Sequence, residues 1–583
     1  MNNMSSLQWT GFPSEIQREI LNEVLVLEEV DKATQVRLPE SGLPGPLSKY
    51  ARVSRDWQEF FEEVNFHRIL LSRPCDLAIF QWITERRLHR SQGEYCMPPI
   101  RHIWLHVDLL RYECQNCLAP ENDREVEQND IFFSDTIKQL FQTLSIIPED
   151  QDGRGLELEF SAGSPSDSEH FFKPWHHVQK DYPHCGDLSR QKEYVAKHQL
   201  KVWDAADEQH GAGSKFGRQL WAKCVATAWS QNREAISRRL IRPLRLANMA
   251  TKLPVAKIVT GLLIRRQFFR DISTSSLRHL LQSLPCLRTL RRENWRLPLL
   301  ADRKPDDGLY SRTNGPWWGA NCLLPALPEG LTTLQLFEDF EMQLHGRYDV
   351  ERPRDSRIKL LSNLARSTPR LQELSVGFLT EAIDAFGLRN FYLNPKGIHN
   401  FPIYPFKHLE NVILTSQEHL RPDQSRHKIN CLLRAAAAVA LKMPRLRVME
   451  LWNCADGHAS VFRYDSRRVS KDRACTVTWR SNWDCYSDLV IEPDVMEAFA
   501  RVARAHYPNA CSPGSPIAPV RFVRHRLPDE ECAGFVHGYL SYGAVLPYLE
   551  LRHLVLHPIS AMQACEEASP SDHKLLWYQH LKR

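Results

Sequence analysis

Two cysteines and three histidines come nearest to the residue types and spacing of a metal site. Cys114 and Cys117 are separated by two residues, a spacing at which two thiolates can share one zinc ion. A closed zinc site needs four ligands, and no second cysteine pair with this spacing follows. His176, His177 and His184 lack acidic partners at ligand spacing. We therefore interpret the cysteines as reduced thiols in a turn, the histidines as solvated loop residues, and predict no metal.

A glycine-rich stretch, Gly211-Ala-Gly-Ser-Lys-Phe-Gly217, has the glycines and the lysine of a phosphate-binding loop. It lacks the Gly-Lys-Ser/Thr ending and a preceding apolar strand, so we interpret it as a linker. No metalloprotease or serine-hydrolase motif and no paired carboxylates on a recognisable scaffold occur. The sequence predicts a non-catalytic protein without a cofactor, although an enzyme within the insertion at 161–250 stays open.

Arginines gather at several places in the second quarter of the chain and beyond it. Solvated helix faces account for most of them, including Arg239, Arg242 and Arg270. If the strands of adjacent repeats align, however, one group would share a concave surface. Guanidinium groups in such an arrangement favour an acidic or phosphorylated segment through bidentate contacts. This hypothesis assigns substrate binding to Arg265, Arg266, Arg291 and Arg292.

Composition bounds the class of protein. The 583 residues carry a formal charge of +5, with 43% apolar and 25% charged residues, which is ordinary for a soluble globular protein. The weak net charge proposes neither nucleic acid nor a membrane as a partner. The 15 cysteines are odd in number and scattered, which suits reduced thiols. With no signal-like start and no apolar stretch of spanning length, we expect an intracellular protein, cytoplasmic or nuclear.

One apolar pattern returns at intervals of about 40 residues. Apolar residues recur at offsets of three and two, and helical segments end at Pro285, Pro369 and Pro444 shortly before three of the matches. A helix, a proline and then Leu-x-x-Leu-x-Leu resemble the leucine-rich repeat, so we predict an α/β fold: an irregular leucine-rich-repeat-like solenoid of parallel strands and helices over 67–583. The triplets begin at Phe66, Ile100, Leu331, Leu371, Leu409, Leu446 and Leu551, with a partial match at Leu287.

Two segments interrupt the repeats. The first, at about 161–250, is polar, opens with a predicted loop at 161–168 and continues with surface helices. The second spans 461–519. Within it, 461–464 and 476–479 alternate like paired strands, and 494–505 has the pattern of a helix.

The N-terminal residues predict two short amphipathic helices. Ser14 has the position of a helix N-cap, with Gln17 three residues later in a capping-box spacing. Apolar residues then recur at the helical period from Ile16 to Leu27, and a second stripe at the same period runs from Tyr50 to Phe61. A segment of this size buries little surface and needs a partner.

The two stripes carry a family resemblance. A Pro-x-Glu-Ile-x-x-x-Ile start and a later Val-Ser-Arg-x-Trp resemble the F-box, over about a tenth of the chain, with Phe12 where the family usually has leucine and a longer link between the two cores. The resemblance implies a helical module at 1–66 that docks on the Skp adaptor of a cullin-RING ubiquitin ligase and presents an unknown protein substrate. The alternative is an interaction scaffold that joins no ligase. The implied adaptor contacts are Phe12, Pro13, Ile16, Ile20, Leu21, Leu47, Val53 and Trp57.

Overall fold

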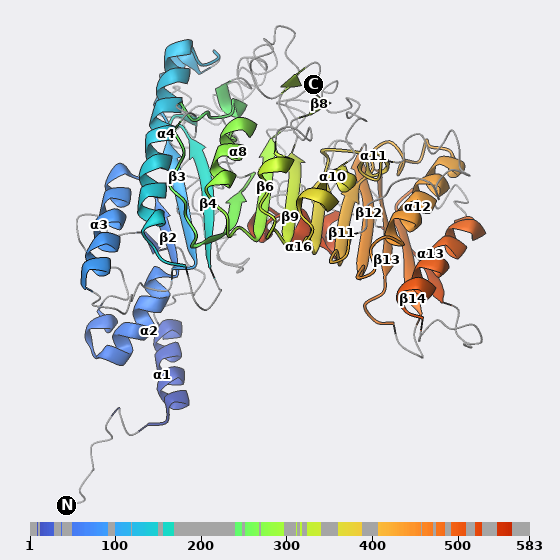
Figure 1. The fold of residues 1–583 in the computed structure, drawn as a ribbon, viewed down its shortest axis with the longest axis horizontal. Helices are drawn as coiled ribbons and strands as arrows, with labels where there is room; N and C mark the ends of the chain where they lie inside the picture. Colours follow the sequence, from blue (N-terminus) through green and yellow to red (C-terminus); the bar gives the residue numbers. More distant parts are fainter. Residues whose placement is uncertain are drawn as a thin grey trace, which may run out of the picture.

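The computed structural model forms one long open sheet whose strands lie side by side in chain order (Figure 1). Among the described residues, the sheet has 13 strands, and β7 and β8 form a separate pair. The strands are β1 Val36–Arg37, β2 Arg68–Leu71, β3 His102–Asp108, β4 Leu156–Gly163, β5 Val259–Ile264, β6 Thr289–Trp295, β7 Tyr310–Ser311, β8 Gly315–Pro316, β9 Thr333–Asp339, β10 Glu373–Gly377, β11 Asn411–Thr415, β12 Val448–Ala455, β13 His458–Asp465, β14 Cys475–Ser481 and β15 Val520–Arg526.

The structure describes part of the chain. The described residues are 9, 12–27, 36–37, 49–90, 100–117, 119–149, 155–167, 239–247, 251–266, 270–295, 310–311, 315–316, 323–339, 360–387, 406–455, 458–469, 474–483, 491–508, 519–527 and 545–561. The predictions for 176–184 and 211–217, and most of the insertion predicted at 161–250, lie outside them.

The repeated apolar triplets form parallel strands, as predicted. All neighbours from β1 to β12 pair in parallel. The register aligns the second residue of each triplet, so that Leu290, Leu334 and Leu374 lie in one row, all fully buried. Each strand therefore buries its apolar side against its neighbours rather than within its own repeat. The α/β prediction with parallel strands is confirmed.

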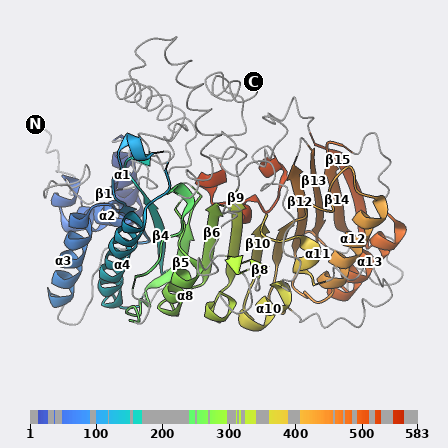
Figure 2. The ribbon, with the colours of Figure 1, turned by 90° about the horizontal axis from the view of Figure 1, so that it is seen from above.

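Helices cover one face of this sheet (Figure 2). Four predicted helices are confirmed, with ends shifted by a few residues: the three that precede Pro285, Pro369 and Pro444, and the one at 494–505. Side-chain caps fix several starts, since Asn122 forms a capping box with Glu125 and Ser425 accepts from the backbone of Lys428. The helices are α3 Pro74–Arg90, α4 Asp123–Ser145, α8 Thr274–Gln282, α10 Leu360–Ser367, α11 Ala382–Ala385, α12 Arg426–Ala440 and α13 Pro493–His506.

The segment at 461–519 continues the sheet, so its interpretation as an interruption is wrong. The predicted strand pair is confirmed as β13 and β14. Strand β13 lies between β12 and β14 and pairs antiparallel with both. The predicted helix is α13. Its Phe499 packs on the rings of Phe462 and Tyr464 at centroid distances of 5.3 and 5.2 Å. A further strand, β15, pairs parallel with β14 and is the last of the sheet.

The last predicted triplet does not form a strand. Leu551, Leu554 and Leu556 lie on and beside a short helix, α16 Arg552–Val555. This helix packs on the face opposite the helices given above, which we call the α16 face. There they pack against Phe337 and Trp452. Their offsets fit one helical turn as well as a strand, and packing across the sheet decides between the two.

The loop predicted at 161–168 is also wrong in part. Ser161 lies within β4, and the turn that follows at Ser164–Asp167 is buried. The Ser164 hydroxyl donates to the carbonyl of Leu110, and Asp167 accepts from the backbone of Ser164. Polar residues here satisfy one another inside the protein, which composition alone does not reveal.

The N-terminal helices project from the sheet beside β2 (Figure 1). They are α1 Ser14–Leu27, the 3-10 helix η3 Tyr50–Arg52 and α2 Arg55–Phe66. Both predicted helices are confirmed, but Ser14 is the first helical residue rather than the cap. Gln17 instead donates its side-chain amide to the carbonyls of Trp9 and Phe12. Between the two helices, β1 adds the first strand of the sheet.

Candidate functional site

The N-terminal module has an apolar interior of its own. Leu21 and Leu25 on α1 are 4% and 3% exposed and pack with Phe61 and Val64 on α2. Trp57 packs on this cluster from the side. Leu21 therefore stabilises the module from within rather than offering a direct adaptor contact. Trp57 is only partly buried, and its contact with the adaptor stays a prediction.

The serine of the Val-Ser-Arg-x-Trp motif has a structural role. Ser54 is the N-cap of α2, and its side chain accepts from the backbone N–H of Trp57 at 3.3 Å. This bond fixes the start of α2 and thereby the position of Trp57. The centroid of the Trp57 ring lies 5.5 Å from that of Trp9. The indole N–H of Trp9 in turn donates to Asp56 at 3.3 Å. The motif thus builds the contact between its two cores.

A second set of apolar residues on this module faces solvent. Ile16, Ile20 and Val53 are 41%, 36% and 60% exposed, and Pro13 is exposed as well. Ile16 and Ile20 lie four residues apart, hence on one side of α1, while Leu21 and Leu25 occupy the side that faces α2. Phe12 is half-buried, and Leu47 lies outside the described residues. The module therefore presents an apolar surface at Pro13, Ile16 and Ile20 that no described element covers.

Three of the four arginines assigned to substrate binding are buried and paired with carboxylates. Arg265 donates to Glu159 at 2.6 Å, and Arg292 pairs with Asp271. Arg266, on the same loop as Arg265, pairs with Asp339. These guanidinium groups are neutralised inside the protein, so the exposed basic surface predicted for them is wrong.

Arg291 differs from its neighbour in the strand. Because successive residues of a strand face opposite sides, Arg291 lies on the α16 face and Arg292 on the face covered by the other helices. Burial lowers the pKa of Arg291, and the nearby Glu293, Glu157 and Glu373 oppose that effect. A single half-buried arginine among three carboxylates does not form a phosphate site, which needs several converging donors.

The α16 face is partly covered by a later segment of the same chain. Residues 545–556 pack on it, with Leu546 and Leu554 in one cluster with Ile413 and Trp452. Below this apolar cover, Glu450 accepts the backbone N–H groups of Glu550 and Leu551 at 3.0 and 2.8 Å. A substrate would have to use another surface or displace this segment.

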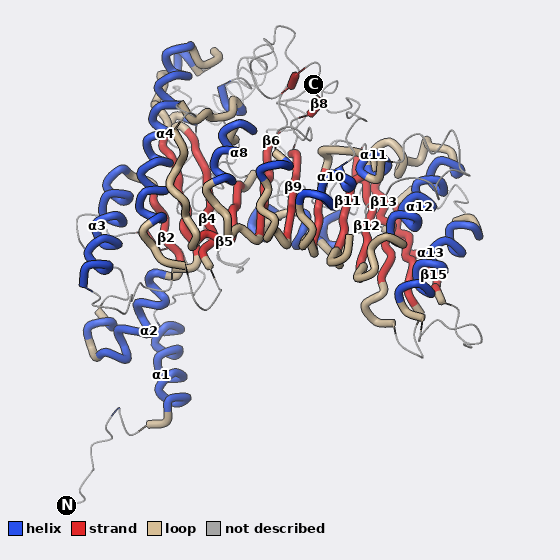
Figure 3. Tube along the Cα trace, in the orientation of Figure 1, coloured by secondary structure: helices blue, strands red, loops and turns tan. Residues whose placement is uncertain are grey.

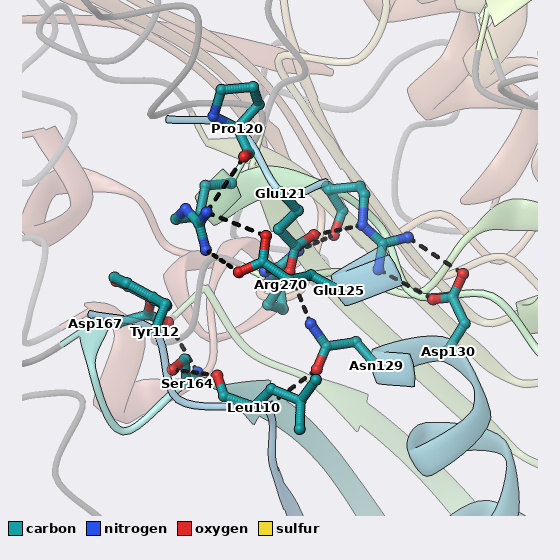
Figure 4. A network of polar contacts seen from close by, with 12 residues as sticks. Leu110, Tyr112, Pro120, Glu121, Glu125, Asn129, Asp130, Ser164, Asp167 and Arg270 are labelled. Carbon is teal, nitrogen blue, oxygen red and sulfur yellow. Dashed lines mark hydrogen bonds and ion pairs between the residues drawn. The ribbon is translucent and has the colours of Figure 1, made fainter. Parts of the chain in front are cut away.

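A buried ionic network joins α4 to the loops around it (Figure 4). Glu121 accepts from Arg242 at 2.6 Å and from Arg270 at 2.9 Å, and Asn129 donates to it at 2.8 Å. Arg242 also pairs with Asp130. The solvated helix faces predicted for Arg242 and Arg270 are therefore wrong. The acidic residues from Glu121 to Asp130 were the only hint in the sequence that these arginines have buried partners.

Burial and charge act in opposite directions on this network. Burial would raise the pKa of Glu121, but the ion pairs and hydrogen bonds with Arg270 and Arg242 outweigh it and hold the pKa at about 2. For Asp167, burial prevails and raises the pKa, and the carboxyl accepts from the hydroxyl of Tyr112 at 2.7 Å. The ion pairs of Glu121 join the segment before α4 to the loops that carry Arg242 and Arg270, so the network stabilises the fold.

Within the described ranges, no cluster of three or more histidine, cysteine or acidic side chains could hold a metal ion, and Cys117 forms no disulfide. No described helix is long and apolar enough to cross a bilayer.

Comparison with known proteins adds a partial match. Residues 326–557 match a family model. That family is described only as one of unknown function, DUF6546. The match covers less than half of the chain and includes β9 to β15 and α16. No curated protein matches.

Among solved structures, the chain is similar to the leucine-rich repeat-containing protein LegL7 from Legionella pneumophila. The two share 12% sequence identity over 72% of this chain and 90% of that chain, with a TM-score of 0.22. At that score, the similarity carries no argument about this fold.

Proposed function

We propose that this protein is the substrate-recognition subunit of a cullin-RING ubiquitin ligase of the SCF type. The N-terminal module docks on the Skp adaptor, and the body of parallel strands and helices, an irregular leucine-rich-repeat-like solenoid, binds a protein substrate. In this role the protein is non-catalytic, because the transfer chemistry resides in other subunits. The F-box resemblance is the source of the proposal.

One observation carries the proposal beyond that resemblance. The two isoleucines of the Pro-x-Glu-Ile-x-x-x-Ile motif, Ile16 and Ile20, are exposed, although Leu21 and Leu25 on the same helix are buried. Large apolar side chains grouped on one exposed helix side favour a protein partner. A motif that only built the module's own interior would turn these residues inward. Their exposure supports a role in docking.

The test is a purification of the tagged full-length chain from its own cells, with mass spectrometry of the proteins that accompany it. We expect the Skp adaptor and a cullin with the wild type and neither with the double variant Ile16→Asp and Ile20→Asp. The control is Ile131→Asp on α4, which changes an isoleucine that is 44% exposed in the body. Absence of the adaptor from the wild-type sample, with other partners retained, would favour the scaffold function instead.

A further inference from the structure

The two ends of the sheet differ in how they are closed. At one end of the described sheet lies β1, only two residues long (Figure 2), and at the other lies β15, with seven (Figure 3). A terminal strand presents a row of backbone N–H and C=O groups on its outer side, which another strand can pair with. A very short edge strand offers little of such a row. β15 offers a row of useful length.

β15 lacks two of the usual features that block pairing at an edge. Its sequence, Val520-Arg-Phe-Val-Arg-His-Arg526, contains no proline, and its parallel register with β14 runs unbroken from Val520↔Cys475 to Arg526↔Ser481. No described strand pairs with its outer side. All its residues from Arg521 on are exposed or half-exposed, and Phe522 is 40% exposed.

Charge on the last two strands has one sign. β14 and β15 together carry four arginines and a histidine and no acidic residue. Arg521 and His525 both lie on the α16 face of β15, and His525 is in register with Arg480 of β14. Burial lowers the pKa of Arg480, and the nearby Arg463 adds to that effect. Arg463 itself is paired with Glu450 at 2.7 Å.

We propose that the outer edge of β15 binds an extended acidic segment of another protein by adding it as a further strand. Backbone hydrogen bonds to β15 would supply the pairing, and carboxylates on the added strand would face Arg521 and His525. A second copy of this chain fits poorly, because two β15 edges would bring like charges together. The inference does not depend on the adaptor-docking proposal.

The test measures the binding of a fluorescein-labelled peptide of alternating glutamate and valine, of about the length of β15, to the full chain by fluorescence anisotropy. We expect a Kd of about 100 μM or tighter at low salt. The same peptide with alternate backbone amides N-methylated keeps its charge but cannot pair as a strand, and we expect it not to bind. On binding, hydrogen exchange at 521–526 should slow.

A matched pair of variants tests the charge. Arg521→Glu should weaken binding about fivefold or more, as expected when an attractive exposed pair becomes repulsive. Arg426→Glu, the same change at an exposed residue of α12, should alter binding by less than about twofold. Both variants should keep the wild-type circular dichroism spectrum.

Several outcomes would overturn the inference. Equal binding of the methylated peptide would reduce β15 to a general basic patch. Tighter binding of a single-stranded oligonucleotide than of the peptide would assign the patch to phosphate. Self-association that R521E enhances would assign the edge to a second copy, and no binding at about 1 mM peptide would leave the edge without this role.

Discussion

The carboxylate of Glu121 should contribute a large share of the stability of the body. In Glu121→Gln, Arg270 loses the carboxylate that it contacts at 2.9 Å and keeps the carbonyl of Arg242 at 3.2 Å. Removing one partner of a buried ion pair commonly costs about 3–5 kcal/mol. The pKa gives a similar figure, since a fall from the ordinary 4.5 to about 2 corresponds to about 3 kcal/mol. We expect the free energy of unfolding at pH 7 to fall by about 3 kcal/mol.

The assay is urea unfolding followed by tryptophan fluorescence, at pH 7 and at pH 3. Because the pKa of Glu121 is lowered in the folded state, its contribution is complete above the unfolded value and is lost as pH falls toward about 2. The gap between wild type and variant should therefore shrink by about half or more at pH 3. The control, Glu127→Gln, changes an exposed residue of α4, the helix that follows Glu121, and should have little effect. A Glu121→Gln variant within about 0.5 kcal/mol of wild type at pH 7 would refute the reasoning.

Two further substitutions test the packing and the capping. Gly377→Ala should destabilise the body by about 2 kcal/mol, because a Cβ there would lie 2.5 Å from the buried ring of Phe337; an unchanged melting temperature would contradict this. Ser54→Ala should cost about 1 kcal/mol by removing the cap of α2. The loss should appear as faster hydrogen exchange in α2, whereas Ser54→Asp, which can also cap, should restore protection.

The apolar triplets predicted the strands because their pattern is local. Offsets of three and two around Leu334 and Leu374 place alternate residues on one side of a strand, and parallel stacking followed from the repetition. The same pattern failed at Leu551, where the partner surface, across the sheet at Trp452, decides between a strand and a helical turn. A pattern of three residues does not contain that information.

Charge was harder to predict than apolar pattern. The arginine-rich segments resembled solvated or binding surfaces because their partners are distant in sequence, as Glu121 is from Arg270 and Glu159 is from Arg265. Helical period placed Ile16, Ile20 and Leu21 on one apolar face of the first helix, but it did not separate the buried Leu21 from the two exposed isoleucines. That separation depends on where α2 packs, which the pattern does not contain. Strand β15 was missed because Phe522 and Val523 are adjacent, so the segment from Val520 to Arg526 does not alternate between apolar and polar residues.

The most direct test of the ligase-receptor proposal is the affinity of the full-length chain for a purified Skp adaptor bound to the cullin N-terminal domain, measured by isothermal titration calorimetry. Truncating one large apolar residue at the centre of an interface commonly costs about 2 kcal/mol, roughly thirtyfold in Kd. We predict tight binding by wild type, loss of about 30-fold or more in Ile16→Ala with Ile20→Ala, and no change in Ile131→Ala. Equal affinity of the double variant and the wild type, or no binding by a folded wild-type chain, would contradict the proposal.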